Sequence, residues 1–150
     1  MMFLILLGAD MMNSFLAVSQ IPVAVASFEN ESVAPAVVSQ VIKADLERSG
    51  VFKVIDAGRV LSETSPVDYN EWKARGARAL VVGSVSKLAD GRYDIRYKLL
   101  DAVNSGELSS MGQSTLPRYT RLAAHKIADD IFLKLTGGMR DHQLDTILDA

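Results

Sequence analysis

The 150-residue chain contains no cysteine and only two histidines, His125 and His142. The absence of cysteine excludes disulfide frameworks, thiolate metal sites and cysteine nucleophiles together. Neither histidine has a partner at the spacing of a metal site or a catalytic triad. We therefore expect no metal ligand, no cofactor and no catalytic residue here, and we interpret His125 as a packed or surface residue of a helix.

The chain also lacks a large excess of either charge sign. The chain has 16 basic and 18 acidic residues and a net charge of -2, so it lacks the basic excess that marks a nucleic-acid-binding surface. A membrane-spanning helix needs about 20 apolar residues in a row, and we predict no membrane span. With 49% hydrophobic residues, a chain of this length is typical of one globular domain with its own core.

The motifs of common enzyme sites are missing as well. The sequence has no G-x-G-x-x-G fingerprint, no phosphate-binding P-loop and no G-x-S-x-G elbow around Ser84 or Ser86. The acidic pairs Asp129–Asp130 and Glu29/Glu31 have no apolar flanks that would separate their pKa values for acid–base catalysis. We interpret the first pair as a solvated helix face and the second as part of a loop. The sequence predicts a protein that is not an enzyme.

The first 20 residues do not fit any standard segment. Met1–Leu7 is apolar, and Ala17-Val18-Ser19 has the small residues of a signal-peptidase site, but no basic residue precedes the apolar run and Asp10 interrupts it. These features indicate a degenerate signal peptide. The alternatives are a misassigned start codon, an added cloning segment or a first strand. We treat residues 1–20 as an N-terminal arm.

Hydrophobic periodicity predicts alternating strands and helices in the rest of the chain. Ile21–Phe28 is short and valine-rich, as in a strand buried on both faces. The helix that follows begins near Pro35 and ends at Gly50, whose missing side chain suits a left-handed C-cap. Residues 51–56 then form the second strand. A short helix before Gly76 has Asp68 as its N-cap, Glu71 at the capping-box position, and Trp72 as a hydrophobic anchor over the sheet.

The second half predicts a meander and a long helix. A third strand over residues 77–88 leads through the Asp-Gly turn of Ala89–Arg92 into alternating residues 93–102 and a last strand over 107–116. A helix from about Arg118 to Thr136 follows, and Gly137-Gly138 is expected to end it. Its apolar stripe consists of Leu122, Ala123, Ile127, Ile131 and Leu135. The predicted core contains Leu46, Val81, Val82, Ile95, Ile127 and Ile131.

These elements define an α+β fold. The order predicts a mixed β-sheet of about five strands, with two main helices packed on one face and a hairpin meander at one side. This topology resembles the anticodon-binding domain of some synthetases. The predicted domain spans residues 21–137, and residues 138–150 form a C-terminal tail.

Four blocks carry a resemblance to a known family. "ADLERSGVFKVID", "WKARGARALVVGSV", "DGRYDIRYKLLD" and "RLAAHKIADDIFLKLTG" occur in this order between about Ile21 and Gly137. Together they resemble the N-terminal domain of the TolB family. In that family a six-bladed β-propeller follows this domain, whereas "GMRDHQLDTILDA" does not look like a blade strand.

The resemblance implies a periplasmic protein–protein interaction module of the Tol–Pal system. Such a module supports outer-membrane integrity and constriction at cell division, and group A colicins exploit it. The implied partners are the C-terminal domain of TolA, met by the segment before the first strand, and Pal, met mainly by the propeller. Gly8–Ser19 occupies the TolA-facing place here, and its apolar residues are the candidate contacts: Met11, Met12, Phe15 and Leu16. A leftover signal, or a cover for a sheet edge, is the alternative.

Two other function classes stay open on the sequence alone. The pattern F-x-N … L-x-x-S-G-x-F-x-V-I-D is shared with lipoprotein modules of curli secretion and synthase activation, and "SFENES … LERSGVFKVID" satisfies it. Those modules usually carry a lipobox cysteine, which this chain lacks. An enzyme or a nucleic-acid-binding domain is the remaining class, and the acidic balance of charge argues against nucleic acid.

Overall fold

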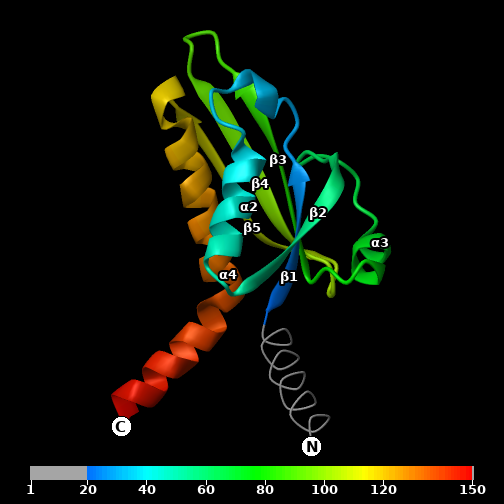
Figure 1. Cartoon of the computed structure of the whole chain (residues 1–150), viewed down its shortest axis with the longest axis vertical. Coiled ribbons are helices and arrows are strands. Elements are labelled where there is room, and N and C mark those ends of the chain that lie inside the picture. Colours follow the sequence, from blue (N-terminus) through cyan, green and yellow to red (C-terminus); the bar gives the residue numbers. More distant parts are fainter. Residues whose placement is uncertain (1–19, 150) are drawn as a thin grey trace, which may run out of the picture.

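The computed structural model describes the backbone of residues 20–149 and the side chains of residues 20–137. A five-stranded sheet is covered on one face by two long helices, α2 and α4, as Figure 1 shows. The elements in chain order are β1 (Ile21–Ser27), η1 (Glu31–Val33), α2 (Val38–Arg48), β2 (Phe52–Val60), α3 (Tyr69–Ala74), β3 (Ala79–Lys87), β4 (Tyr93–Asp101), β5 (Gly106–Thr115), η2 (Pro117–Tyr119) and α4 (Thr120–Asp149).

The sheet mixes parallel and antiparallel pairs. Its strand order is β2-β1-β3-β4-β5. β1 pairs in parallel with both β2 and β3, and β3, β4 and β5 form an antiparallel meander. The α+β class, the mixed five-stranded sheet and the two helices on one face are therefore confirmed.

The sheet has a core on each face, because successive side chains of a strand point to opposite sides. Val23 and Val25 of β1 pack under α2 and α4 in the larger core. Ala24 and Ala26 point the other way, into a smaller core that also contains Trp72 of α3. The helices thus do not all lie on one face, since short α3 covers the opposite side.

The predicted core residues are buried without exception. Those on strands and on α2 and α4 are at most 1% exposed: Leu46, Val81, Val82, Ile95, Ile127 and Ile131. The stripe predicted for α4 is wrong at Leu122, which is 49% exposed. The buried face includes Ala123, Ala124 and Ala128, small residues that let the helix approach its neighbours closely. The predicted stripe included Ala123 but left out Ala124 and Ala128.

The predicted end of the last helix is also wrong. α4 continues through Gly137-Gly138 to Asp149, and Gly137 has none of the positive φ that Gly50 and Gly76 adopt at +75° and +83°. A glycine inside a helix costs only about 1 kcal/mol relative to alanine, so helix-compatible residues on both sides can carry the helix through it. Gly50 and Gly76 end their helices as predicted.

Gly83 in β3 gives a sharp test of the packing. A Cβ added there would lie 2.3 Å from the backbone oxygen of Arg96 and 2.4 Å from Cε2 of Phe28. We expect Gly83→Ala to lower the free energy of unfolding by about 3 kcal/mol, because a paired strand cannot move aside. Gly112→Ala is the matched control, since its Cβ would meet only Cγ of Arg96 at 3.8 Å. Urea melts that give equal stability for the two variants would contradict this packing.

Candidate functional site

Glu31 is a structural cap rather than a loop residue in solvent. Its side chain is buried and accepts hydrogen bonds from the backbone N–H of Phe28 at 3.1 Å and of Ser39 at 2.8 Å, and from the Ser39 hydroxyl at 2.7 Å. The N-cap position of α2, Val37, has no side-chain oxygen to offer. The carboxylate therefore satisfies a free donor of the helix from a distance. Both acidic residues lie in the connection between β1 and α2, as predicted, where Glu31 is buried and Glu29 is exposed.

Asp130 is the acidic residue that the structure places differently from the predicted solvated helix face. Asp129 is exposed as predicted, but Asp130 is partly buried and accepts hydrogen bonds from the Tyr97 hydroxyl and, at 2.7 Å, from the Ser109 hydroxyl. Burial, together with the bond to Asp130, raises the pKa of Tyr97 above its ordinary value. The tyrosine is thus held neutral as a donor. The cluster joins α4 to β4 and β5, and its hydroxyls are already committed to a structural carboxylate.

His125 connects the two long helices. Its Nδ1 contacts the carboxylate of Asp45 on α2, and Arg48 lies 3.5 Å from the same carboxylate. No group of three His, Asp or Glu side chains in the described part of the chain could hold a metal ion. The arrangement fits the sequence interpretation of His125 as a packed or surface histidine.

Trp72 anchors α3 over the second core. Its side chain is 2% exposed, and the guanidinium groups of Arg75 and Arg59 lie 4.5 and 5.2 Å from its ring centroid. Arg59 is held in turn by the carboxylate of Glu71 at 2.7 Å. Asp68 caps α3 as predicted, by accepting from the N–H of residue 70 at 3.1 Å. The second half of the capping box does not form, because the Glu71 carboxylate pairs with Arg59 instead of the backbone N–H of Asp68.

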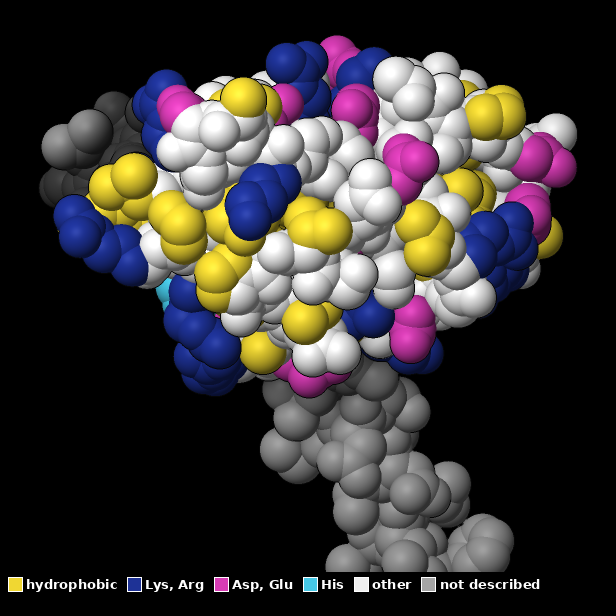
Figure 2. Space-filling model, turned by 90° about the horizontal axis from the view of Figure 1, so that it is seen from above, with side chains coloured by type: hydrophobic (Ala, Val, Ile, Leu, Met, Phe, Trp, Pro, Cys, Tyr) yellow, Lys and Arg dark blue, Asp and Glu magenta, His cyan; other side chains and the backbone are white. Residues whose placement is uncertain are grey.

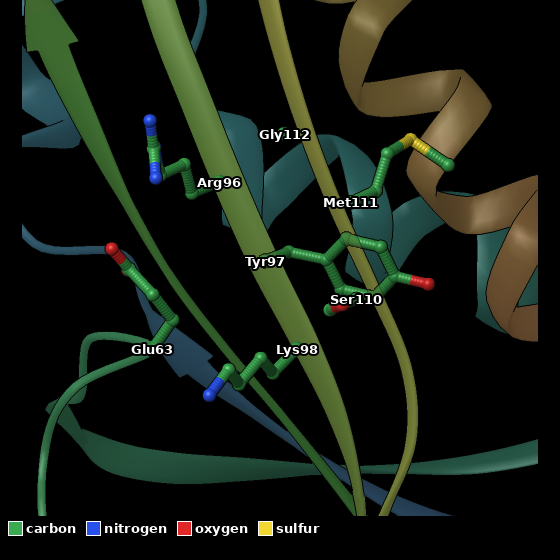
Figure 3. Close-up of a pocket in the computed structure, with 7 residues that line it drawn as sticks. All are labelled: Glu63, Arg96, Tyr97, Lys98, Ser110, Met111 and Gly112. Carbon is green, nitrogen blue, oxygen red and sulfur yellow. The ribbon is translucent and has the colours of Figure 1, made fainter.

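A hollow of about 230 Å³ lies over the sheet, and Figure 3 shows the residues that line it: Glu63, Arg96, Tyr97, Lys98, Ser110, Met111 and Gly112. Arg96, Lys98 and Glu63 lie on one side of β4, whereas Tyr97 and Met111 point toward the helices. Ser84 donates to Glu63 at 3.0 Å. Lys98 is paired with Glu107 at 3.3 Å. Charges of both signs meet here in solvent, so the hollow offers no nucleophile–base pair and no single-sign anion site.

Surface charge is mixed elsewhere too. On the face seen in Figure 2, the dark blue basic and magenta acidic side chains are interspersed with yellow hydrophobic ones. The described residues on that face form no large patch of one sign. An electrostatic footprint for nucleic acid is therefore missing from this face, in line with the balanced composition.

The four candidate partner contacts, Met11, Met12, Phe15 and Leu16, lie outside the described residues. What the structure does describe is the place where the chain enters the domain. Pro22, near the start of β1, lines an open hollow of about 410 Å³ with residues from α3, the α3–β3 connection, the end of β4 and the β4–β5 turn: Lys73, Gly76, Ala77, Arg78, Asp101, Val103 and Asn104. Within the described part, no helix has the length and apolar character needed to cross a membrane.

The chain matches known proteins over most of its length. A family model described as the TolB amino-terminal domain matches residues 16–108. The chain is 42% identical over 125 residues to the Tol-Pal system protein TolB of Polaromonas naphthalenivorans. The aligned region covers 83% of this chain and 29% of the relative. The TolB of Nitrosomonas europaea is 42% identical over 120 residues, or 79% of this chain and 28% of that protein.

A solved structure shares the fold. The crystal structure of TolB from Acinetobacter baumannii aligns with a TM-score of 0.68 and 24% identity, covering 79% of this chain and 29% of that one. The chain therefore spans less than a third of the length of these relatives. On the family match and the sequence identity, this chain belongs to the TolB amino-terminal domain family of the Tol-Pal system.

Proposed function

We propose that the chain is a periplasmic protein–protein interaction module of the Tol–Pal system, supporting outer-membrane integrity, constriction at cell division and the import of group A colicins. Family membership supports this proposal. The polar groups of the described core support it too, since Glu31, Tyr97 and Asp130 are all hydrogen-bonded within the domain. A site built from such committed groups stabilises the fold and leaves nothing to activate a substrate.

We propose the C-terminal domain of TolA as the partner of the arm before β1. The observation that carries this proposal is the extent of the family match, which begins at residue 16 and so reaches into the arm. The arm joins the domain at the open hollow beside Pro22, where a bound partner would meet accessible residues. Met11, Met12, Phe15 and Leu16 are large apolar residues of the arm, and flexible methionines beside an aromatic ring suit an adaptable contact. Contact with Pal is proposed for the propeller region of the relatives.

Titration calorimetry against the C-terminal domain of the cognate TolA tests the arm. We expect measurable heat from the 150-residue chain and none from a version that starts at Gln20, because the shortened version lacks the segment that orders on the partner. Circular dichroism of the shortened version controls for folding. Phe15→Ala combined with Leu16→Ala should lower the affinity, whereas Val60→Ala, at an exposed apolar residue at the end of β2 and away from the hollow beside Pro22, should not. Equal heats from both versions, or none from either, would remove the arm from TolA binding.

A further inference from the structure

β5 forms an outer edge of the sheet with little to protect it. Among the described residues it pairs with β4 alone. Its ten residues, GELSSMGQST, contain no proline and a single charge, Glu107. A bulge that skips Leu108 interrupts the ladder near its start, and the seven residues from Ser109 to Thr115 then run in regular register. A long edge strand with one charge and no proline can serve as a template for pairing with another strand.

The opposite edge of the sheet shows the usual protection. β2 carries the exposed charged side chains of Lys53, Asp56 and Arg59, and Gly58 bends its backbone with a φ of +75°. Its pairing with β1 is shifted in register near that glycine. Charges and irregular backbone on an edge discourage pairing with another chain. The two edges of one sheet therefore differ, and β5 is the edge left open to pairing.

A stripe of exposed side chains on α4 lies beside this edge. It consists of Leu122, Lys126, Asp129 and Leu133, which are spaced so as to share one face of a helix. Leu122 and Leu133 are 49% and 50% exposed. Leu122 and Lys126 line a hollow of about 160 Å³ together with Gln113 and Thr115 of β5, so the first half of the stripe borders the edge strand.

β5 and the α4 stripe would each match the same elements of a second copy of the chain. If two chains meet through an antiparallel β5 pair with the two-fold axis at Met111, Ser110 of one copy faces Gly112 of the other, and Glu107 faces Thr115. The same axis brings the α4 helices together in antiparallel order. Leu122 then lies toward Leu133 of the second copy, and Lys126 toward Asp129. No like charges are opposed, and the apolar and ionic positions match in both directions, as an isologous contact requires.

We propose that β5 and the Leu122–Leu133 stripe of α4 form a homodimer interface that joins two sheets into one of ten strands. The occupant is a second copy of this chain, because the charges of the stripe complement their own copy. This inference does not depend on the proposed Tol–Pal function.

A charge exchange on the full chain tests the helix part of the interface. Sedimentation velocity over a concentration series should show a monomer–dimer equilibrium for the wild type. Lys126→Glu would place a glutamate near Asp129 of the second copy, and we expect the dimer dissociation constant to rise about tenfold. The double variant Lys126→Glu/Asp129→Lys restores opposite charges and should recover wild-type affinity. A wild type that stays monomeric throughout, or a dimer that Lys126→Glu leaves unchanged, would overturn the proposal.

Disulfide trapping tests the strand register. The chain has no cysteine of its own, so each introduced cysteine reports only itself. Ser110 and Gly112 are both exposed, and there is space for a side chain at Gly112. Directly opposed residues can be bridged, whereas diagonal neighbours at about 7–8 Å cannot.

Mixing Ser110→Cys with Gly112→Cys should therefore give the mixed disulfide, identified by mass, and either variant alone should give little dimer. Efficient cross-linking of each variant to itself, with none in the mixture, would overturn this register. A mixture that stays reduced under oxidation, while the noncovalent dimer persists, would overturn the β5 pairing itself.

Discussion

Trp72→Ala is expected to lower the free energy of unfolding by about 3–5 kcal/mol, the range for removing a buried aromatic side chain. Trp72 is the largest buried side chain of the second core, and most of the other buried members of that cluster are small. They include five alanines, Ala24, Ala26, Ala57, Ala77 and Ala102. Small side chains cannot move into the volume of an indole, so a cavity remains. Arg59 and Arg75 would also lose the ring face against which they lie.

Trp72→Phe separates these contributions. Phenylalanine keeps part of the buried area and a ring for the two guanidinium groups, so we expect a loss well below that of alanine. Urea unfolding followed by circular dichroism measures both variants, since the only tryptophan of the chain is the residue replaced. A Trp72→Ala protein within 1 kcal/mol of wild type would show that α3 does not hold this face of the sheet (a loss that small is typical of surface positions).

Alternation and glycine positions made most of the fold predictable. Tyr93, Ile95, Tyr97 and Leu99 are all buried as the period of two required, and the strands around them follow the predicted order. These signals are local, since each depends only on neighbours within the same element. Gly137 shows the limit of a local signal. A glycine marks a helix end at Gly50 and lies inside a helix at Gly137, and the sequence pattern around a glycine does not separate the two cases.

Long-range pairing explains why Asp130 was misplaced. Asp130 meets Tyr97 across 33 positions of sequence, and its surface or buried state depends on that distant hydroxyl. The capping role of Glu31 could have been predicted from the sequence. A helix that begins at Val38 without a side-chain cap leaves its first N–H groups unpaired, and a glutamate a few residues upstream was the available acceptor. Searching for the missing cap would have found Glu31.

The pattern F-x-N … L-x-x-S-G-x-F-x-V-I-D also has a structural cause. Asn30 adopts a left-handed backbone with φ of 60°, a conformation that asparagine tolerates better than most residues. Phe28 packs against Gly83 of β3, and Gly50 turns the chain from α2 into β2. These positions support one way of joining β1, α2 and β2. The pattern therefore describes this joint and does not decide between the functions.

Ile131→Ala and Ile127→Ala are each expected to lower the free energy of unfolding by about 2–5 kcal/mol. Both side chains lie in the larger core between α4 and the sheet, with exposures of 0% and 1%. Each truncation removes buried apolar area and leaves a cavity that the packed strands cannot fill. A loss at the upper end would consume a large part of the 5–15 kcal/mol that typically stabilises a domain.

Leu122→Ala and Leu133→Ala are the matched controls on the same helix. Both leucines are about half exposed, so their truncation should change stability by less than about 0.5 kcal/mol. Urea melts at a protein concentration too low for self-association separate this effect from any dimer contact. The register of α4 requires a large loss for the two isoleucines and almost none for the two leucines. Comparable losses for Leu122→Ala and Ile127→Ala would mean that α4 is rotated, with the leucine stripe facing the sheet.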